Sequence, residues 1–457
     1  MNRVRKRAWI MMIFILGLLG GMCFFLYEYW TRAEEWIVFR GSPHVFASTS
    51  VGNGTFLDCE GEILMDATDG RKYSDDLLVR QSMLHWLGDK DGHIQTTVLS
   101  HYASAMVGFD RINGVYAYAD AQGVTELTVS ARVQAAALKA LAGRKGTVAV
   151  YNYRTGEILC AVSTPTYDPD KVPDIAGDTS GIYEGVYLNR FLQSTYPPGS
   201  IFKIVTTAAA LDSVPGIRDM SFSCSGVYEL SGSRVTCERA HGKQDIKKAM
   251  ANSCNCAFAQ IAVLVGSDTL AEYVDQFGIT DSVSFDGVTT AEGNFDLAGA
   301  DQVALAWSAI GQYTDMVNPC RYMTFLGAIA AGGEAAVPYL VEKVTVGNSG
   351  TYWAQTSRQE RIMSEELAET LKDFLRNNVE SIYGAGNFPG LTVCAKSGTS
   401  ELGGGQKPNA MFAGFVADEE YPLAFIAVVE NGGYGANTCV PIMSAVLAQC
   451  KAVLDNR

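Results

Sequence analysis

The sequence lacks the short patterns by which metal sites are usually recognised. Its 457 residues include eleven cysteines but no Cys-x-x-Cys pair. The five histidines, His44, His85, His93, His101 and His241, show no His-Glu-x-x-His or comparable ligand spacing. The sequence therefore does not indicate a metal site.

Basic residues are also scarce. The formal net charge is -14, and no basic stripe follows the first few residues. Because nucleic-acid-binding proteins usually carry a basic face, this balance argues against nucleic acid as a partner. Hydrophobic residues make up 48% of the chain and charged residues 18%, which provides buried cores for two folded units and argues against bulk disorder.

The N-terminus is sharply polarised. An uncharged run from Ala8 to Tyr27 follows a cluster of cations, and Glu28 is the first acidic residue after it. The cations are Arg3, Arg5, Lys6 and Arg7. About twenty helical residues cover roughly 30 Å, the thickness of the hydrocarbon core. We expect a cytoplasmic tail over 1–7 and a transmembrane anchor over 8–27, because positive flanks stay inside.

A cleaved signal peptide is the rival interpretation of this segment. The apolar run is longer than a typical signal core, and Tyr27, Tyr29 and Trp30 suit an interfacial aromatic belt. No second apolar run approaches this length, so we expect residues 28–457 to lie outside the cell.

Two cysteines lie where a disulfide is conceivable. Cys224 and Cys237 flank a hairpin-like stretch that contains glycine. A disulfide between them and a pair of free thiols are equally compatible with the sequence.

Hydrophobic periodicity predicts an α+β fold. Residues 28–125 are irregular and suggest a mostly β module with short helices, while Ser130 is the expected N-cap of a short helix. Strands are expected at Thr147–Tyr151, Glu157–Val162, Leu391–Ala395, Met411–Val416 and Leu423–Val429. Helices are expected at Lys203–Leu211, Ala251–Val265, Ala304–Ile310 and Pro441–Val453. This order predicts one antiparallel sheet assembled from both ends of the region, with a helical lobe inserted.

A serine stands at the expected start of the helix that begins near residue 201. Ser200 directly follows Pro-Pro-Gly, and Lys203 comes three residues later, over the same helical face. A serine hydroxyl needs an adjacent base, and a lysine becomes one when burial or a nearby cation lowers its pKa. Alone, such a tetrad is most often a solvated surface pair.

Two further short motifs follow. Ser253-Cys254-Asn255 precedes a helical run, where Ser253 or Asn252 could simply be an N-cap. Lys396-Ser397-Gly398-Thr399 follows an expected strand, where a solvated strand end is the plain alternative.

In this order, Ser-x-x-Lys, Ser-x-Asn and Lys-Ser/Thr-Gly resemble the signature of penicillin-binding proteins and serine β-lactamases. The likeness extends along the chain. It includes Arg40-Gly41, Asp58 to Leu64 (with Cys59 and Glu60 departing from the usual pair), Thr155 to Ile158, Ser163 to Pro165, Asp168-Pro169, Asn189-Arg190, His241-Gly242 and Phe412 to Phe415.

The resemblance implies a role for each motif residue. Ser200 would be the acylated nucleophile, Lys203 its proton acceptor and Ser253 the proton relay, with Lys396 as electrostatic support. Asn255 would bind the amide of the substrate, and Ser397, Gly398 and Thr399 would frame its terminal carboxylate. The oxyanion hole would consist of the N–H groups of Ser200 and Thr399.

The implied reaction is D,D-transpeptidation of peptidoglycan stem peptides without a cofactor, inhibited by β-lactams. The stretch before residue 123 is too short for a glycosyltransferase domain, so the chain resembles class B. This implies a pedestal over 28–125, a transpeptidase domain over 126–457, and a separate polytopic membrane glycosyltransferase serving elongation, division or sporulation.

Two other functions are weighed against this one. The tetrad Ser200-Ile-Phe-Lys203 also matches the class D β-lactamases, so a β-lactamase, a β-lactam sensor or a D,D-carboxypeptidase is the first alternative. The pedestal and the Ser-x-Asn motif speak against it. The second is an inactive scaffold of wall synthesis, which has no need of two lysines around a helix-capping serine.

Overall fold

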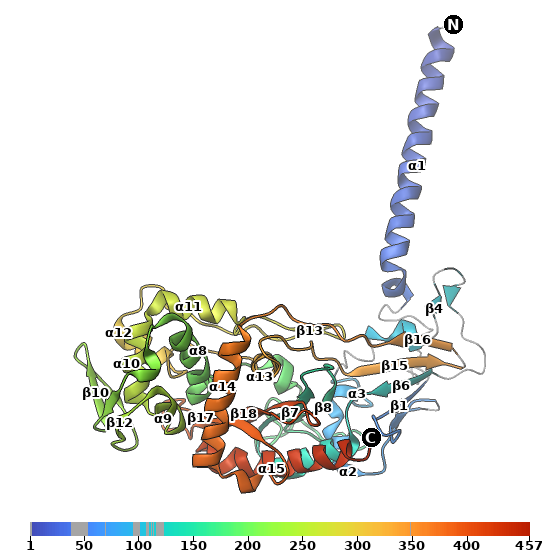
Figure 1. The fold of residues 1–457 in the computed structure, drawn as a ribbon. Helices are drawn as coiled ribbons and strands as arrows, with labels where there is room; N and C mark the ends of the chain where they lie inside the picture. Colours follow the sequence, from blue (N-terminus) through green and yellow to red (C-terminus); the bar gives the residue numbers. More distant parts are fainter. Residues whose placement is uncertain are drawn as a thin grey trace.

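The computed structural model describes residues 2–37, 54–68, 70–94, 101–106, 109–110, 112, 114–115, 123–347 and 349–457. The Arg40-Gly41 signal lies outside these residues. Helix α1 (Asn2–Ile37) stands clear of the body of the protein (Figure 1). The body contains two large sheets, one with a helical lobe beside it.

The sheet beside the helical lobe has five strands and is the one predicted from strands at both ends of the transpeptidase region. Its order is β17-β18-β19-β7-β8, and every neighbouring pair is antiparallel. The strands are β7 (Gly146–Asn152), β8 (Ile158–Thr164), β17 (Val393–Ser400), β18 (Asn409–Val416) and β19 (Leu423–Val429). All five predicted strands are confirmed, although β17 begins later than expected and runs on through the Lys-Ser-Gly-Thr motif.

Both faces of this sheet are buried. Val148 and Val150 pack into one apolar cluster and Ala149 and Tyr151 into another, as the period of two along a strand requires. Helices α6 (Ala131–Leu141) and α15 (Gly435–Leu454) contact one face, and α13 (Pro319–Ala330) contacts the other. Ser130 caps α6 as predicted, accepting a hydrogen bond from the Val133 N–H.

The lobe holds most of the remaining helices. They are α7 (Arg190–Gln193), α8 (Lys203–Ser213), α9 (Ile246–Ala251), α10 (Asn255–Val265), α11 (Ser267–Gln276), α12 (Gln302–Ser308) and α14 (Glu365–Asn378). The short helical turns are η1 (Gly199–Phe202), η2 (Ile217–Asp219), η3 (Val379–Tyr383) and η4 (Ala385–Asn387). Three two-stranded ribbons are formed by β9 (Phe222–Cys224) with β12 (Gly242–Gln244), β10 (Val227–Leu230) with β11 (Ser233–Thr236), and β13 (Ser284–Phe285) with β14 (Val288–Thr289).

One predicted helix is not continuous in the structure. The expected helix from Ala251 to Val265 is broken into α9 and α10, because Ser253 adopts a left-handed backbone with φ 51°. The N-cap of α10 is Cys254, whose Sγ accepts from the Ala257 N–H, rather than Ser253 or Asn252. The break frees Ser253 to point at the site described below.

A six-stranded sheet forms the second body, in the order β16-β15-β6-β1-β2-β3. Its strands are β1 (Gly54–Leu57), β2 (Ile63–Asp66), β3 (Lys72–Tyr73), β6 (Gly123–Leu127), β15 (Val341–Val346) and β16 (Ser349–Trp353). Short helices α2 (Leu77–Ser82), α3 (Leu84–Leu87) and α5 (Ala103–Met106) and the pair β4 (Phe109–Asp110) and β5 (Gly114–Val115) accompany it. Two of its strands thus come from far along the chain.

Specific polar contacts tie the two bodies together. Arg80 of α2 binds Asp168 through two hydrogen bonds of 2.8 and 2.9 Å, and the Trp86 indole N–H donates to the Ala161 carbonyl at 2.6 Å. Asp58 accepts hydrogen bonds from the Glu60 and Glu62 N–H groups and, through its other oxygen, from Ala131 N–H. Asp58 and Asp168, which both belong to stretches of the sequence resemblance, thus connect segments across this boundary.

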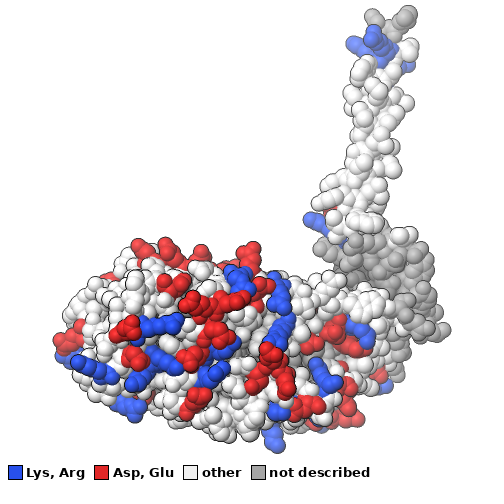
Figure 2. Space-filling model, in the orientation of Figure 1, with Lys and Arg blue, Asp and Glu red and all other residues white. Residues whose placement is uncertain are grey.

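Two described helices are long and apolar enough to cross a membrane. In α1 the span Arg3–Ala33 has a mean hydropathy of 2.4 and its apolar side chains are exposed, whereas α15 has 1.3 and packs its apolar face on the sheet. Figure 2 shows Lys and Arg gathered near the free end of α1, a long uncharged stretch after them, and charged atoms again toward the other end of the helix. The segment predicted as an anchor is therefore helical and unpacked.

The Cys224–Cys237 disulfide does not form. All eleven cysteines are free, so the free-thiol alternative describes the structure.

Candidate active site

The three sequence motifs meet at one place. Ser200 lies in the turn η1, and Lys203 is the first residue of α8. The Lys203 Nζ and the Ser200 Oγ are 2.9 Å apart. The predicted pairing of nucleophile and amine is thus present in the folded chain.

Lys203 has three further polar partners. Its Nζ lies 2.9 Å from the Ser253 carbonyl oxygen, 3.0 Å from the Ser253 Oγ and 2.7 Å from the Asn255 Oδ1. The carbonyl and amide oxygens can only accept, so a neutral Lys203 directs its two N–H groups to them. The lone pair of the amine is then left for the hydroxyl proton of Ser200.

The second lysine approaches from β17. Lys396 Nζ donates to the Ser253 Oγ at 3.1 Å and to the Ser397 carbonyl at 2.9 Å. The Ser253 hydroxyl therefore lies between the two amines.

Burial shifts both lysines toward the neutral form. Each has 0% of its surface exposed. Desolvation, and then the charge of Lys396, holds the pKa of Lys203 well below its usual range. Desolvation lowers the pKa of Lys396 to about 7. Lys203 is consequently able to act as a base at neutral pH.

Glycines allow the Ser200 turn to lie against β17. Gly199 has φ +53°, and a Cβ there would come within 2.5 Å of the Thr399 carbonyl oxygen. A Cβ on Gly398 would come within 2.9 Å of the Pro198 carbonyl oxygen. The N–H of Gly199 also donates to the Gly311 carbonyl at 2.8 Å. Close backbone approach thus brings the Ser200 turn beside Thr399.

The remaining predicted residues have partners outside the lysine network. Ser397 Oγ lies 3.0 Å from the Tyr383 hydroxyl, which also accepts from the Ser397 N–H at 2.9 Å. Thr399 Oγ1 accepts from the Gly435 N–H at 3.1 Å. No sequence motif marks Tyr383, so it is not among the predicted site residues.

A second cluster forms beside the motifs. Ligand atoms of Cys224, Cys237, His241 and Cys254 all lie within 4.8 Å of one another. Spacing in the sequence does not indicate this group, because its residues come from separate turns and meet without a regular spacing. The Ser-Cys-Asn-Cys stretch and the nearby His241 were the available signal.

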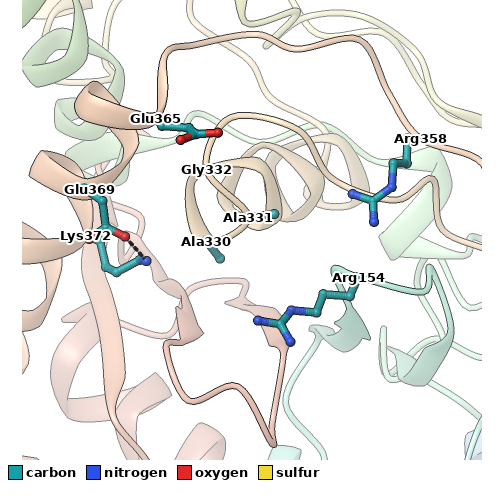
Figure 3. Close-up of a pocket in the computed structure, with 8 residues that line it drawn as sticks. All are labelled: Arg154, Ala330, Ala331, Gly332, Arg358, Glu365, Glu369 and Lys372. Carbon is teal, nitrogen blue, oxygen red and sulfur yellow. Dashed lines mark hydrogen bonds and ion pairs between the residues drawn. The ribbon is translucent and has the colours of Figure 1, made fainter.

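A surface hollow lies elsewhere and contains none of the predicted site residues (Figure 3). It is lined by Arg154, Ala330, Ala331, Gly332, Arg358, Glu365, Glu369 and Lys372. Lys372 and Glu369 form an ion pair there, whereas Arg358 and Glu365 pair with Glu334 and Arg361, which do not line the hollow.

Comparison with known proteins agrees with this geometry. Residues 146–448 match the family described as "Penicillin binding protein transpeptidase domain", which covers most of the chain. The chain belongs to the penicillin-binding protein transpeptidase family. The match spans all three motifs and the five-stranded sheet.

Curated relatives narrow the class. The chain is 30% identical over 356 residues to peptidoglycan D,D-transpeptidase PbpA of Mycolicibacterium smegmatis, covering 71% of this chain and 72% of that protein. It is 27% identical over 402 residues to stage V sporulation protein D of Bacillus subtilis, covering 82% of this chain and 58% of that protein. These are class B penicillin-binding proteins, and α1 with this membership identifies a membrane-anchored protein.

Solved structures share the fold. The D,D-transpeptidase domain from Eggerthella lenta superposes with a TM-score of 0.73 at 25% identity, covering 88% of this chain and 98% of that one. Penicillin-binding protein A of M. tuberculosis, solved as a penicillin G acyl-enzyme, gives a TM-score of 0.70 at 24% identity, covering 87% and 99%.

Proposed function

We propose that this class B penicillin-binding protein is a peptidoglycan D,D-transpeptidase that cross-links stem peptides through an acyl-enzyme on Ser200. The observation that carries the proposal is the hydrogen-bonded network of Ser200, Lys203, Ser253 and Lys396, in which both lysines are buried. A nucleophile, a desolvated base and a hydroxyl relay are the groups that serine acyl transfer requires. An inactive scaffold would gain nothing from burying two lysines beside a serine.

Acylation starts at the Ser200 hydroxyl. Its proton passes to the Lys203 lone pair as Oγ bonds to the penultimate D-Ala carbonyl carbon. The resulting oxyanion accepts from the N–H groups of Ser200 and Thr399, and the close contact of Gly199 with Thr399 supports this assignment.

Collapse of the tetrahedral intermediate breaks the peptide bond to terminal D-Ala. The departing amine takes a proton from the Ser253 hydroxyl, which is replenished from Lys203 at 3.0 Å. An amine of a neighbouring stem then attacks the ester carbon, gives up its proton along the same path and returns Ser200 to its hydroxyl form.

The substrate contacts follow the family roles. Ser397, Gly398 and Thr399 line the carboxylate end, and Lys396 supports the proton network electrostatically beside Ser253. Asn255 binds the substrate amide; its Nδ2 donates one hydrogen to the Thr236 carbonyl at 2.9 Å in the free protein, which leaves the second hydrogen for the substrate.

The β-lactamase alternative lacks a deacylating base. Within the described residues, no carboxylate forms a hydrogen bond or ion pair with Ser200, Lys203 or Ser253. Lys203 Nζ already has four polar partners within 3.0 Å, which argues against the carboxylated lysine of class D enzymes.

Penicillin G should therefore leave a stable adduct of its full mass on Ser200. The lactam leaving group stays tethered after ring opening and blocks the acceptor, so the adduct should persist over many minutes. Intact-protein mass spectrometry after timed incubation measures this, with Ser200→Ala as the loss variant and Ser267→Ala as a matched control. Turnover to free enzyme and penicilloate within seconds would move the assignment to a β-lactamase.

The architecture follows the class B plan. We assign residues 1–7 to the cytoplasm, 8–27 to a single membrane span, 28–125 to a pedestal and 126–457 to the transpeptidase domain outside the cell. The glycan strands come from a separate polytopic glycosyltransferase. The cations at the free end of α1 support this orientation (Figure 2).

A further inference from the structure

Three thiols and an imidazole gather directly beside the Ser-x-Asn motif. Cys224 ends β9, Cys237 follows β11, His241 precedes β12, and Cys254 is the N-cap of α10. Pairing of β9 with β12 sets Gly242 opposite Cys224 and so holds His241 near that thiol. Cys224 and Cys254 are buried, and the other two are half-buried.

The spacing of the ligand atoms fits a tetrahedral ion. Zinc bonds to sulfur at about 2.3 Å and to imidazole nitrogen at about 2.0–2.1 Å, which sets tetrahedral edges of about 3.8 Å between two sulfurs and about 3.6 Å between sulfur and nitrogen. The Cys237 and Cys254 Sγ atoms are 3.6 Å apart. Cys224 Sγ lies 3.5 Å from His241 Nδ1.

A disulfide does not explain this cluster. Bonded sulfurs lie about 2.0 Å apart, well short of the observed separation, and a pair of cysteines would leave the third thiol and the imidazole unaccounted for. Three thiols and a nitrogen donor whose ligand atoms all lie within 4.8 Å of one another form instead a Cys3His set, which zinc prefers.

Backbone groups reinforce two of the sulfurs. The Cys256 N–H donates to Cys237 Sγ at 3.3 Å, and the Ala257 N–H donates to Cys254 Sγ at 3.4 Å. Both donors belong to the first turn of α10, where unpaired N–H groups favour negative charge. Such outer hydrogen bonds orient metal ligands and stabilise thiolates.

We propose that Cys224, Cys237, His241 and Cys254 hold one structural zinc ion. Four protein ligands leave no open position, so the ion anchors the fold and does not activate water. The inference goes beyond the transpeptidase reaction, in which no metal takes part.

The ion would fix the Ser-x-Asn turn. Cys254 stands between Ser253, whose left-handed backbone needs outside support, and Asn255. Ser253 and Asn255 together supply three of the four polar partners of Lys203. Cys254 is thus a positioning residue: by tying it to β9 and to the stretch between β11 and β12, the zinc holds the relay serine at Lys203.

Metal content tests the proposal directly. The full-length protein, purified in detergent with reductant and Zn²⁺ and then desalted, should contain about one zinc per chain by mass spectrometry of the metal. Cys224→Ser and Cys237→Ser should lose at least half of it. Cys160→Ser and Cys439→Ser, which change buried cysteines outside the cluster, should keep it.

Spectroscopy on the unmutated protein decides the case if the ligand variants fail to fold. Co²⁺ exchanged into the site should show thiolate-to-metal charge transfer and the intense visible bands of tetrahedral cobalt. Absence of zinc from the reduced, metal-replete protein, an octahedral cobalt spectrum or a Cys237–Cys254 disulfide by peptide mapping would each overturn the proposal.

Chelation tests the positioning role. Removing zinc should slow penicillin acylation of Ser200 about tenfold, and Zn²⁺ but not Mg²⁺ should restore it. Unchanged acylation in verified zinc-free protein would refute positioning. Failure of the transpeptidase proposal looks different, since Ser200 would then form no stable adduct even in zinc-replete protein.

Discussion

Lys203 and Lys396 are unusual because both amines are buried without a carboxylate partner among the described residues. Their polar partners are hydroxyls, carbonyls and one side-chain amide. Such an environment stabilises the neutral amine, since no negative charge offsets the loss of hydration. The chemistry of this site therefore depends on where the two protons reside.

Replacing Lys203 by alanine should slow acylation of Ser200 by at least 10²-fold, because a positioned general base contributes about that much. The rate of penicillin adduct formation, followed by intact mass, measures the effect. Lys139→Ala, on the exposed face of α6, is the control and should react normally. A Lys203→Ala protein that acylates at the normal rate would show that another group takes the proton.

The charge of Lys396 should control the pH dependence of acylation. Lys203 works only when neutral, so the rate rises as pH increases through the pKa of Lys203. Lys396 is one cause of the low pKa of Lys203, so Lys396→Gln should raise that pKa and move the rising limb to higher pH, besides lowering the maximum rate. Acylation rates measured from pH 5 to 10 for the parent and for Lys396→Gln check this. A rising limb that stays at the same pH in the variant, or moves to lower pH, would contradict the prediction.

Asp315 offers a pH test of stability away from the reaction. It is 1% exposed, accepts a hydrogen bond from Ser308, and burial raises its pKa to about 8. Because its pKa is raised, Asp315 keeps its proton in the folded chain up to about pH 8, whereas in the unfolded chain it loses the proton near pH 4. The stability that the folded chain gains from a neutral Asp315 is therefore fully present below pH 4 and is lost as pH rises to about 8. Asp315→Asn should therefore gain thermal stability over the parent as pH rises between these limits.

Melting temperatures of parent and Asp315→Asn protein from pH 5 to 9 measure that difference. Asp91→Asn, at an exposed position, should follow the parent at every pH. A difference between Asp315→Asn and parent that shrinks with rising pH would have the wrong sign and would rule out a buried neutral acid.

Among the secondary-structure elements, local pattern predicted the five strands of the five-stranded sheet and the helices α6, α8, α12 and α15, but no individual strand of the six-stranded sheet and neither α13 nor α14. A short apolar run such as Leu423–Val429 is stable as a strand that is buried on both faces of a sheet. The break at Ser253 could not be read this way, because tertiary contacts with Lys203 and Lys396 stabilise a backbone that local preference disfavours. The pairing of β6 with β15 and the Cys3His cluster were missed for the same reason: both join segments distant in sequence.

The contact between η1 and β17 should be sensitive to one methyl group. Gly199→Ala places a Cβ against the Thr399 carbonyl and should push the Ser200 turn away from its oxyanion donor, lowering acylation at least tenfold. Gly216→Ala is the matched control: its φ of +72° carries similar strain of roughly 1 kcal/mol, but nothing lies within 4 Å of the added Cβ. Equal acylation rates of the two variants would show that the close contact between Gly199 and Thr399 does not matter for acylation.

In the whole molecule, the two large sheets are not built from consecutive parts of the chain, because strands of the six-stranded sheet come from both before and after strands of the five-stranded sheet. β15 and β16 leave the lobe to complete the six-stranded sheet, and β6 lies between β15 and β1. Arg80 and Trp86 add side-chain contacts across the same boundary. The proposed pedestal is thereby held firmly against the catalytic part, as positioning a site at a distance from the membrane requires.

The part of the chain after the anchor should fold without a membrane. A chain beginning at Glu28 should remain monodisperse without detergent, because α1 is the described helix whose apolar side chains lie exposed, while the other long apolar helix, α15, already packs on the sheet. Removing the N-terminal cations also leaves the truncated chain more acidic, which favours solubility. Size-exclusion chromatography with penicillin labelling of Ser200 tests both folding and function, with the full-length protein expected to need detergent. Aggregation of a truncated chain that labels poorly would mean that the segment before Glu28 stabilises the body itself, and that the division into an anchor and an independent outer part is wrong.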